Sequence, residues 1–175
     1  NGALAERYRR CVMPPLNLLI KPASGRCNLC CRYCFYKDEM NNRACSEYGQ
    51  MSIETMHILI DKAMTYGDGT CVFGFQGGEP MLMGLDFYKE FTAYVRAHAN
   101  SERLRIQYTM QTNGVLINDT WAKWFAENQV LVGLSLDGPE EIHDRYRVDH
   151  SGNGTFQKVI HAVHTLERYR VDYNI

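Results

Sequence analysis

Short apolar runs alternate with longer amphipathic segments along this chain of 175 residues. The short runs are typical of buried strands, and the longer segments carry apolar residues at helical spacing. Strands separated by helices of about 10–15 residues form right-handed βαβ units around a parallel sheet. The expected strands are 16–20, 70–75, 104–112, 130–136 and the start of another at 171–175. The expected helices are 52–67, 85–98, 118–128, 140–146 and 155–169.

These elements predict an α/β fold class, a partial (βα) parallel barrel. Four whole strands and the start of a fifth are too few to close an eight-stranded barrel, so we expect a chain truncated after about four βα units. Residues 16–175 would form this core as one domain. Residues 1–15, which contain Arg7, Arg9, Arg10 and two prolines, are typical of an edge or mobile segment.

Charge and hydropathy exclude several kinds of partner. A formal net charge of -1 and a pI near 6.6 give no bulk attraction to nucleic acid or to an anionic membrane. No apolar run reaches the ~18 residues of a membrane span, and the N-terminus lacks the pattern of a signal peptide. We therefore expect a cytoplasmic protein that binds neither nucleic acid nor a membrane.

Cysteines are crowded in one short segment, 27–34, which reads CNLCCRYC. Cys27, Cys31 and Cys34 have the spacing C-x3-C-x2-C, and seven cysteines in the chain cannot all pair as internal disulfides. Three thiolates on one loop can bind three corners of a cubane iron–sulfur cluster. The fourth iron would then remain open to a chelating small molecule.

Two other interpretations of these cysteines remain open. A zinc site would be completed by Cys30, Cys45 or a histidine, although the second ligand pair that is typical of zinc sites is missing. A thioredoxin-like redox pair of Cys31 and Cys34 would leave Cys27 unexplained. We predict that Cys30, inside the spacer, is not a ligand, and that the isolated Cys11, Cys45 and Cys71 are small hydrophobic residues.

At these residues the chain resembles the radical S-adenosylmethionine (SAM) superfamily. That superfamily has the same cysteine spacing after its first strand, with an aromatic residue before the last cysteine, where Tyr33 stands here. Its second signature is a GGEP-type turn after the second strand, which Gly77, Gly78 and Glu79 begin here.

Finer similarity, from Leu16 onward, is to the anaerobic sulfatase-maturating branch, which is formylglycine-generating and of the SPASM type. Related peptide-modifying enzymes share several of its motifs. These motifs are KPAS at 21–24, CFY at 34–36, FQGGEP at 75–80, QTNG at 111–114, SLDGP at 135–139 and HDRYR at 143–147.

The resemblance implies a [4Fe–4S] cluster and SAM as cofactors. Cys27, Cys31 and Cys34 would be the metal ligands, and the open iron would bind the amino and carboxylate groups of SAM. The other residues implied to bind SAM are Tyr33, the turn residues Gly77, Gly78 and Glu79 at its amino group, Ser135 at its ribose or carboxylate region, and Arg147 at its carboxylate. No particular part of SAM is implied for Tyr33. An arginine fork suits a carboxylate.

Three further residues are implied to face the substrate: Tyr36, Thr112 and Asn113. Thr112 and Asn113 stand where the third strand ends, at the edge where parallel sheets place ligands, although a turn also explains Asn-Gly. The catalytic aspartate of the family and its auxiliary clusters would lie beyond Ile175. His143, His161 and His164 are given no chemical role.

The implied reaction is reductive cleavage of SAM to a 5'-deoxyadenosyl radical, which oxidises a cysteine or serine of a peptide to formylglycine. The implied partners are a peptide segment of a sulfatase or another peptide, and an electron donor such as a flavodoxin or ferredoxin. Two alternatives remain: another radical SAM peptide maturase, for example a thioether-forming one, and a non-catalytic zinc-binding module.

Overall fold

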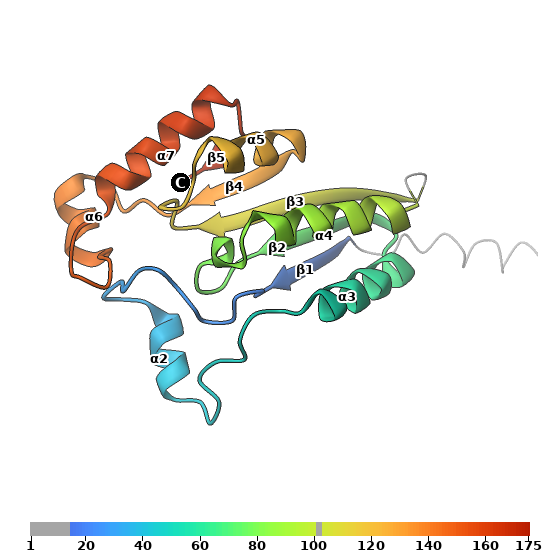
Figure 1. Cartoon of the computed structure of the whole chain (residues 1–175), viewed down its shortest axis with the longest axis horizontal. Coiled ribbons are helices and arrows are strands. Elements are labelled where there is room, and N and C mark those ends of the chain that lie inside the picture. The colour runs from blue at the N-terminus through green and yellow to red at the C-terminus, as the bar shows by residue number, and fades with distance from the viewer. Residues whose placement is uncertain (1–14, 101–102) are drawn as a thin grey trace, which may run out of the picture.

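The computed structural model describes residues 15–100 and 103–175 (Figure 1). The predicted N-terminal segment therefore lies outside the described residues, apart from Pro15, and so does Cys11. The strands are β1 (Leu16–Ile20), β2 (Gly69–Phe75), β3 (Leu104–Thr112), β4 (Val130–Leu134) and β5 (Tyr173–Asn174). The helices are α2 (Phe35–Asn41), α3 (Ile53–Tyr66), η1 (Pro80–Met83, a 3-10 helix), α4 (Leu85–His98), α5 (Asp119–Glu127), α6 (Glu140–Tyr146) and α7 (Phe156–Arg168).

The five strands form one parallel sheet in the order β1-β2-β3-β4-β5. This order confirms the predicted α/β architecture, in which each strand pairs with the next one along the chain. All five carboxyl ends therefore meet at one edge of the sheet, where the loops after β1, β2, β3 and β4 come together.

Helices cover one face of the sheet, and the main core lies beneath them (Figure 1). Phe73 and Phe75 of β2 pack edge-to-face on Phe91 of α4, with ring centroids 5.0–5.1 Å apart. Side chains on the other face are exposed, including Leu19 (65%) and Leu131 (41%). The alternation along each strand thus sets a buried face against an open one.

Helix caps explain why several helices begin where the sequence predicts. Ser52 accepts a hydrogen bond from the backbone N–H of Thr55 at 3.1 Å, which caps α3. Asn118 caps α5 in the same way through the N–H of Trp121. None of the helices in the described part of the chain is long and apolar enough to cross a bilayer.

The structure adds two helices that the sequence did not predict, α2 and η1. Helix α2 has no buried residue, so it lacks the apolar stripe from which a helix is recognised. β4 also ends two residues earlier than expected, at Leu134. There the chain turns away from the sheet, after Ser135 donates its N–H to the carbonyl of Thr112 at 3.0 Å.

Candidate active site

A cavity of about 240 Å³ opens at the carboxyl edge of the sheet. We call it the edge cavity. The loops after β1, β2, β3 and β4 each contribute to its wall. Every predicted site residue lines the edge cavity except Glu79. The fold therefore brings together motifs that are separated by more than 100 residues in the sequence.

The cysteine loop is held against the segment that follows α6. The backbone N–H of Cys30 donates to the carbonyl of Val148 at 2.8 Å, and that of Arg32 donates to Tyr146 at 2.9 Å. Leu29, which is buried, forms an isolated antiparallel bridge with Asp149. These contacts fix the backbone between the first and last predicted ligands.

The three predicted cluster ligands are free thiols, and they also line a second cavity of about 400 Å³. The residues common to the two cavities are Cys27, Cys31, Cys34 and Leu29. A group held by all three thiolates would therefore lie between the cavities, with one side toward the edge cavity. Cys30 lines the second cavity but not the edge cavity, and Lys37 Nζ lies 3.4 Å from its sulfur.

The surroundings of Cys27 and Cys31 favour the protonated thiol in the absence of a metal. Burial raises the pKa of Cys27 to about 11, and the charges of Glu79 and Cys31 add to this, against hydrogen bonds from the N–H of Leu29 and from Asn113. Burial also raises the pKa of Cys31, against the opposing charge of Arg147. Because metals bind thiolates, loading this loop must release protons.

The donor set suits a cluster in its chemistry: three free thiols on one loop, facing a shared space. Within residues 15–100 and 103–175, no three His, Cys, Asp or Glu side chains are grouped to hold a single metal ion. Three thiolates on one tetrahedral zinc ion would lie about 3.8 Å apart. In a cubane each thiolate binds a different iron, so the sulfurs need not approach so closely.

Glu79 lies beneath the edge cavity and is fully buried (0% exposed). Its Oε1 accepts hydrogen bonds from Met81 N at 3.0 Å and from Thr112 Oγ1 at 2.8 Å, and its Oε2 accepts from Asn113 N at 2.8 Å. Its own N–H donates to the carbonyl of Arg26 at 2.7 Å. Glu79 thus joins the loops after β1, β2 and β3, and its contact with the SAM amino group stays a prediction.

Burial raises the pKa of Glu79 to about 7, although its three hydrogen bonds act in the opposite direction. The folded state therefore binds a proton that the unfolded chain releases near pH 4.5. The stability from this proton is present below that pH and is lost as the pH rises through about 7. We expect a loss on the order of 3 kcal/mol in the free energy of unfolding, which Glu79→Gln removes.

Urea unfolding of the metal-free protein from pH 4.5 to pH 8 measures this effect. The curve of Glu79→Gln should be flatter than that of the unaltered protein, although its stability is lower throughout because an amide cannot accept all three hydrogen bonds. Glu141→Gln, at an exposed carboxylate, is the matched control. Parallel curves for Glu79→Gln and the unaltered protein would contradict the raised pKa.

Thr112 and Asn113, which the resemblance assigns to the substrate, are both buried and hold loops together. The Thr112 hydroxyl donates its hydrogen bond to Glu79, as described above. Asn113 Nδ2 donates to Asn28 Oδ1 at 2.8 Å and lies 3.7 Å from Cys27 Sγ, while its Oδ1 accepts from Val115 N at 3.0 Å. Their contact with a substrate stays a prediction, because the structure commits their polar atoms to neighbouring loops.

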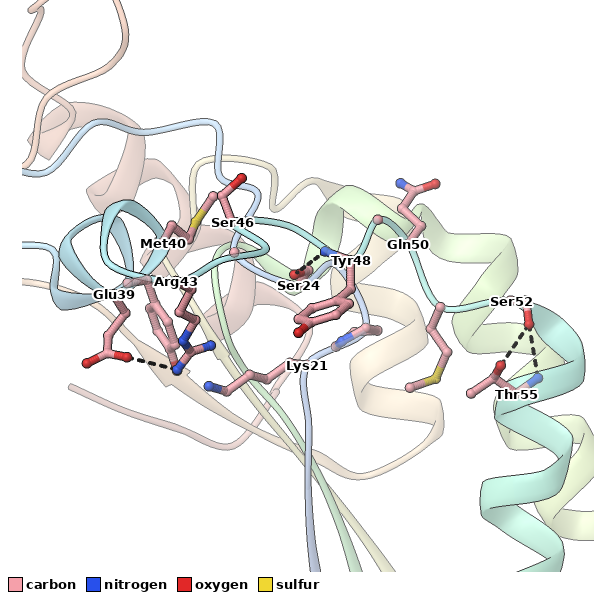
Figure 2. Close-up of a pocket in the computed structure, with 15 residues that line it drawn as sticks. Lys21, Ser24, Glu39, Met40, Arg43, Ser46, Tyr48, Gln50, Ser52 and Thr55 are labelled. Atoms are coloured by element: carbon pink, nitrogen blue, oxygen red, sulfur yellow. Dashed lines mark hydrogen bonds and ion pairs between the residues drawn. The ribbon is translucent and has the colours of Figure 1, made fainter.

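Tyr36 lies between the edge cavity and a third cavity of about 420 Å³ beside α2. Its hydroxyl accepts a hydrogen bond from Gln76 Nε2 at 3.3 Å, and Lys21 Nζ lies 4.7 Å from the ring centroid. Figure 2 shows the third cavity, where Tyr48 N donates to Ser24 Oγ at 3.2 Å. Tyr36 thus lines both cavities, and its contact with a substrate stays a prediction.

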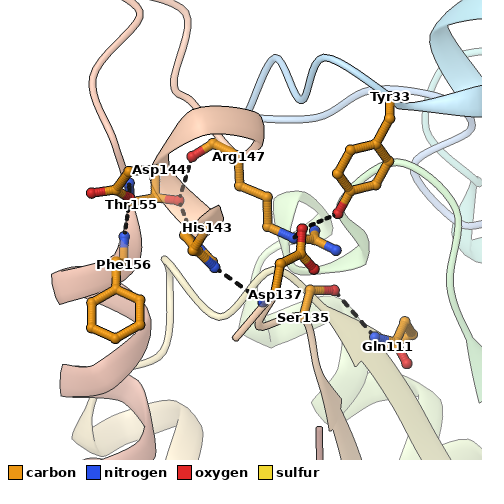
Figure 3. A network of polar contacts seen from close by, with 9 residues as sticks. All are labelled: Tyr33, Gln111, Ser135, Asp137, His143, Asp144, Arg147, Thr155 and Phe156. Atoms are coloured by element: carbon orange, nitrogen blue, oxygen red, sulfur yellow. Dashed lines mark hydrogen bonds and ion pairs between the residues drawn. The ribbon is translucent and has the colours of Figure 1, made fainter. Parts of the chain in front are cut away.

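Arg147 and Tyr33, which both line the edge cavity, meet at the carboxylate of Asp137 (Figure 3). The Tyr33 hydroxyl donates to Asp137 Oδ2, and Arg147 Nε lies 3.0 Å from the same oxygen. Among the described residues, Arg147 Nε is buried with no aligned hydrogen-bond acceptor, so this contact is an ion pair. The guanidinium also lies 5.4 Å from the Tyr33 ring centroid.

These charges shift the pKa values of the group. Burial acts to raise the pKa of Asp137, but the hydrogen bond from Tyr33 and the charge of Arg147 outweigh it and hold that pKa below its usual range. Burial and the bond to Asp137 both raise the pKa of Tyr33. Asp137 therefore stays ionised and anchors Arg147 beside the cavity.

Ser135 faces the edge cavity from the end of β4, and Gln111 Nε2 donates to its hydroxyl at 3.2 Å. Sequence reasoning missed Gln76, Gln111 and Asp137 as residues of the site. Gln76 and Gln111 stand inside motifs of the resemblance, so position within those motifs was the available signal. Asp137 stands in the SLDGP motif, where an aspartate before glycine is typical of a turn, and nothing in the sequence pairs it with Arg147.

Comparison with known proteins identifies relatives of this chain among the sulfatase-maturating enzymes. The cysteine-type anaerobic sulfatase-maturating enzyme of Clostridium perfringens (strain 13 / Type A) is 48% identical over 163 residues, covering 93% of this chain and 44% of that protein. The serine-type enzyme of Bacteroides thetaiotaomicron is 35% identical over 161 residues, covering 91% of this chain and 38% of that protein. The predicted resemblance to the sulfatase-maturating branch is therefore confirmed.

Solved structures agree with the sequence relatives. Native anSMEcpe with bound AdoMet and Cp18Cys peptide superimposes with a TM-score of 0.85 at 46% identity, covering 93% of this chain and 42% of that one. The chain thus spans less than half the length of these relatives.

The family model of the Radical SAM superfamily matches residues 22–175, which include the cysteine loop and strands β2 to β5. The cofactors of this superfamily are SAM and a four-iron cluster, as the sequence analysis expects. The chain therefore belongs to the radical SAM superfamily.

Proposed function

We propose that the protein containing this chain cleaves SAM reductively at a four-iron cluster and oxidises a peptide cysteine to formylglycine. The observation that carries this proposal is the edge cavity, because its wall combines three free thiols with Arg147 and Ser135. The similarity to sulfatase-maturating enzymes over 93% of the chain supports the reaction class. An electron donor such as a flavodoxin or ferredoxin is a partner in this proposal.

Cysteine is the proposed target rather than serine. The chain is 47–48% identical to cysteine-type enzymes of two Clostridium species and 34–35% identical to serine-type enzymes. The solved structure named above contains a Cp18Cys peptide in addition to AdoMet. A serine-containing peptide is the second candidate, since both types of relative align over most of the chain.

The residues of this chain would bind the cluster and orient SAM beside it. Cys27, Cys31 and Cys34 would hold the cluster, which supplies the electron that breaks a carbon–sulfur bond of SAM when both are bound. Arg147, held by Asp137, offers its guanidinium to the carboxylate of SAM, and Ser135 offers a hydroxyl.

Anaerobic reconstitution with iron, sulfide and SAM tests this function. With a reductant and a cysteine peptide of a sulfatase, we expect 5'-deoxyadenosine and a peptide aldehyde that a hydrazine captures. A thioether product instead would assign the protein to another class of peptide maturase. One tightly bound zinc ion and no SAM binding would refute the enzyme assignment in favour of a zinc-binding module.

Arg147→Ala is expected to weaken SAM binding while the cluster survives. Losing a charge-assisted, two-pronged contact to a carboxylate costs about 2–3 kcal/mol, which raises the dissociation constant of SAM about 30- to 150-fold. Equilibrium dialysis gives this constant, and iron analysis gives the cluster content. Arg145→Ala, at an exposed arginine in the last turn of α6, is the control. Unchanged SAM affinity in Arg147→Ala would remove this residue from the site.

A further inference from the structure

The buried imidazole of His143 is connected by hydrogen bonds to both members of the Asp137–Arg147 ion pair. His143 on α6 is fully buried (0% exposed) (Figure 3). Its Nδ1 accepts a hydrogen bond from the backbone N–H of Asp137 at 3.3 Å, and its Nε2 lies 3.1 Å from Thr155 Oγ1. Because Nδ1 accepts, the proton of the neutral ring is on Nε2, which donates to Thr155.

Thr155 carries the connection onward to Arg147. Its hydroxyl donates to the backbone carbonyl of Arg147 at 2.9 Å. The imidazole is therefore bonded to the backbone of Asp137 directly and to the backbone of Arg147 through one hydroxyl. These are the two residues whose side chains form the ion pair beside the edge cavity.

Hydrogen bonds also fix the backbone around Thr155. Asp144 Oδ1 accepts the backbone N–H groups of Thr155 and Phe156 at 2.7 and 2.8 Å, which holds the first turn of α7 against α6. The Phe156 ring packs edge-on against the imidazole, with centroids 5.7 Å apart. The Thr155 hydroxyl, which accepts the hydrogen bond from His143 Nε2, therefore has a defined position.

We propose that His143 is a positioning residue, which orients Arg147 and Asp137 relative to each other so that the guanidinium faces the edge cavity. This inference rests on the proposed function of Arg147 in SAM binding. His143 itself does not line the cavity. Without the imidazole, the N–H of Asp137 loses its buried acceptor, and the loop after β4 loses the bond that sets where the carboxylate points.

The protonation state of the imidazole agrees with this function. Burial lowers the pKa of His143, and the charge of Arg147 lowers it further, against Asp137 and Asp144. The ring therefore stays neutral. A charged ring would place a second N–H against the N–H of Asp137, and this would break the connection.

Three variants test the proposal through the dissociation constant of SAM, measured by equilibrium dialysis on the reconstituted protein. His143→Phe, which keeps a ring but no polar atom, should raise this constant about tenfold at unchanged iron content. His143→Asn restores an acceptor near the Nδ1 position and should recover part of the affinity. Thr155→Val removes the hydroxyl that connects the imidazole to the Arg147 carbonyl and leaves the bond to Asp137, so it should raise the constant about threefold.

His164→Phe, exposed on α7, is the matched control and should bind SAM normally. If His143→Phe fails to fold, Thr155→Val still decides the question. Unaltered SAM affinity in Thr155→Val and in folded His143→Phe, in a protein where Arg147→Ala binds SAM weakly, would reduce His143 to a packing residue. Unaltered affinity in Arg147→Ala would instead overturn the proposed function of Arg147.

Discussion

Protein in which alanine replaces Cys31 is expected to emerge from anaerobic reconstitution without a cluster. Only two of the three thiolate ligands then remain on the loop, and two ligands are too few to retain a four-iron cluster. Cys27→Ala and Cys34→Ala should behave in the same way. Iron and sulfide analysis, together with the visible absorption of the protein, gives the result: about four irons per chain in the unaltered protein and nearly none in these variants.

Two other cysteines serve as controls for this experiment. Cys30 is a neighbour of Cys31 in the chain, but it faces the second cavity beside Lys37, so Cys30→Ala should keep its iron. Cys71 is buried in β2, remote from the loop, and Cys71→Ala should also keep its iron. A loss of iron from Cys30→Ala as large as from Cys31→Ala would contradict the ligand assignment.

Elements with their own local signals were predictable from the sequence. The bounds of α4 and β3 agree with the structure residue for residue, since an apolar period and a following polar turn define each. Helix α2 was not predictable, because it packs no apolar face. The parallel pairing followed from the alternation of strands and helices, which allows few other topologies.

The site was predictable as a set of positions and not as a set of contacts. Motifs named the residues around the edge cavity, and chain connectivity placed them at one end of the sheet. The bonds of Glu79 to Asn113 and of Asp137 to Tyr33 join residues 34 and 104 positions apart. No local pattern encodes such pairs. For this reason the sequence did not show that the Glu79 carboxylate joins three loops, and its contact with SAM stays a prediction.

Gly78→Ala is expected to separate the GGEP turn from the cysteine loop. Gly78 has φ +53°, in the left-handed region, and a Cβ there would lie 2.8 Å from the carbonyl carbons of Gly25 and Arg26, and closer still to the oxygen of Arg26. These are backbone atoms, so no side chain can move aside. Left-handed strain and overpacking together should lower the free energy of unfolding by about 3 kcal/mol.

Gly69→Ala separates these two contributions, because Gly69 has φ +74° but no atom within 4 Å of its added Cβ. It should cost only the backbone strain, about 1 kcal/mol, and should keep its iron. In Gly78→Ala, the Cβ pushes away Arg26, whose carbonyl accepts the N–H of Glu79 and which directly precedes Cys27. Iron content should therefore fall together with stability. Equal unfolding curves and equal iron in the two variants would show that the turn does not position the cysteine loop.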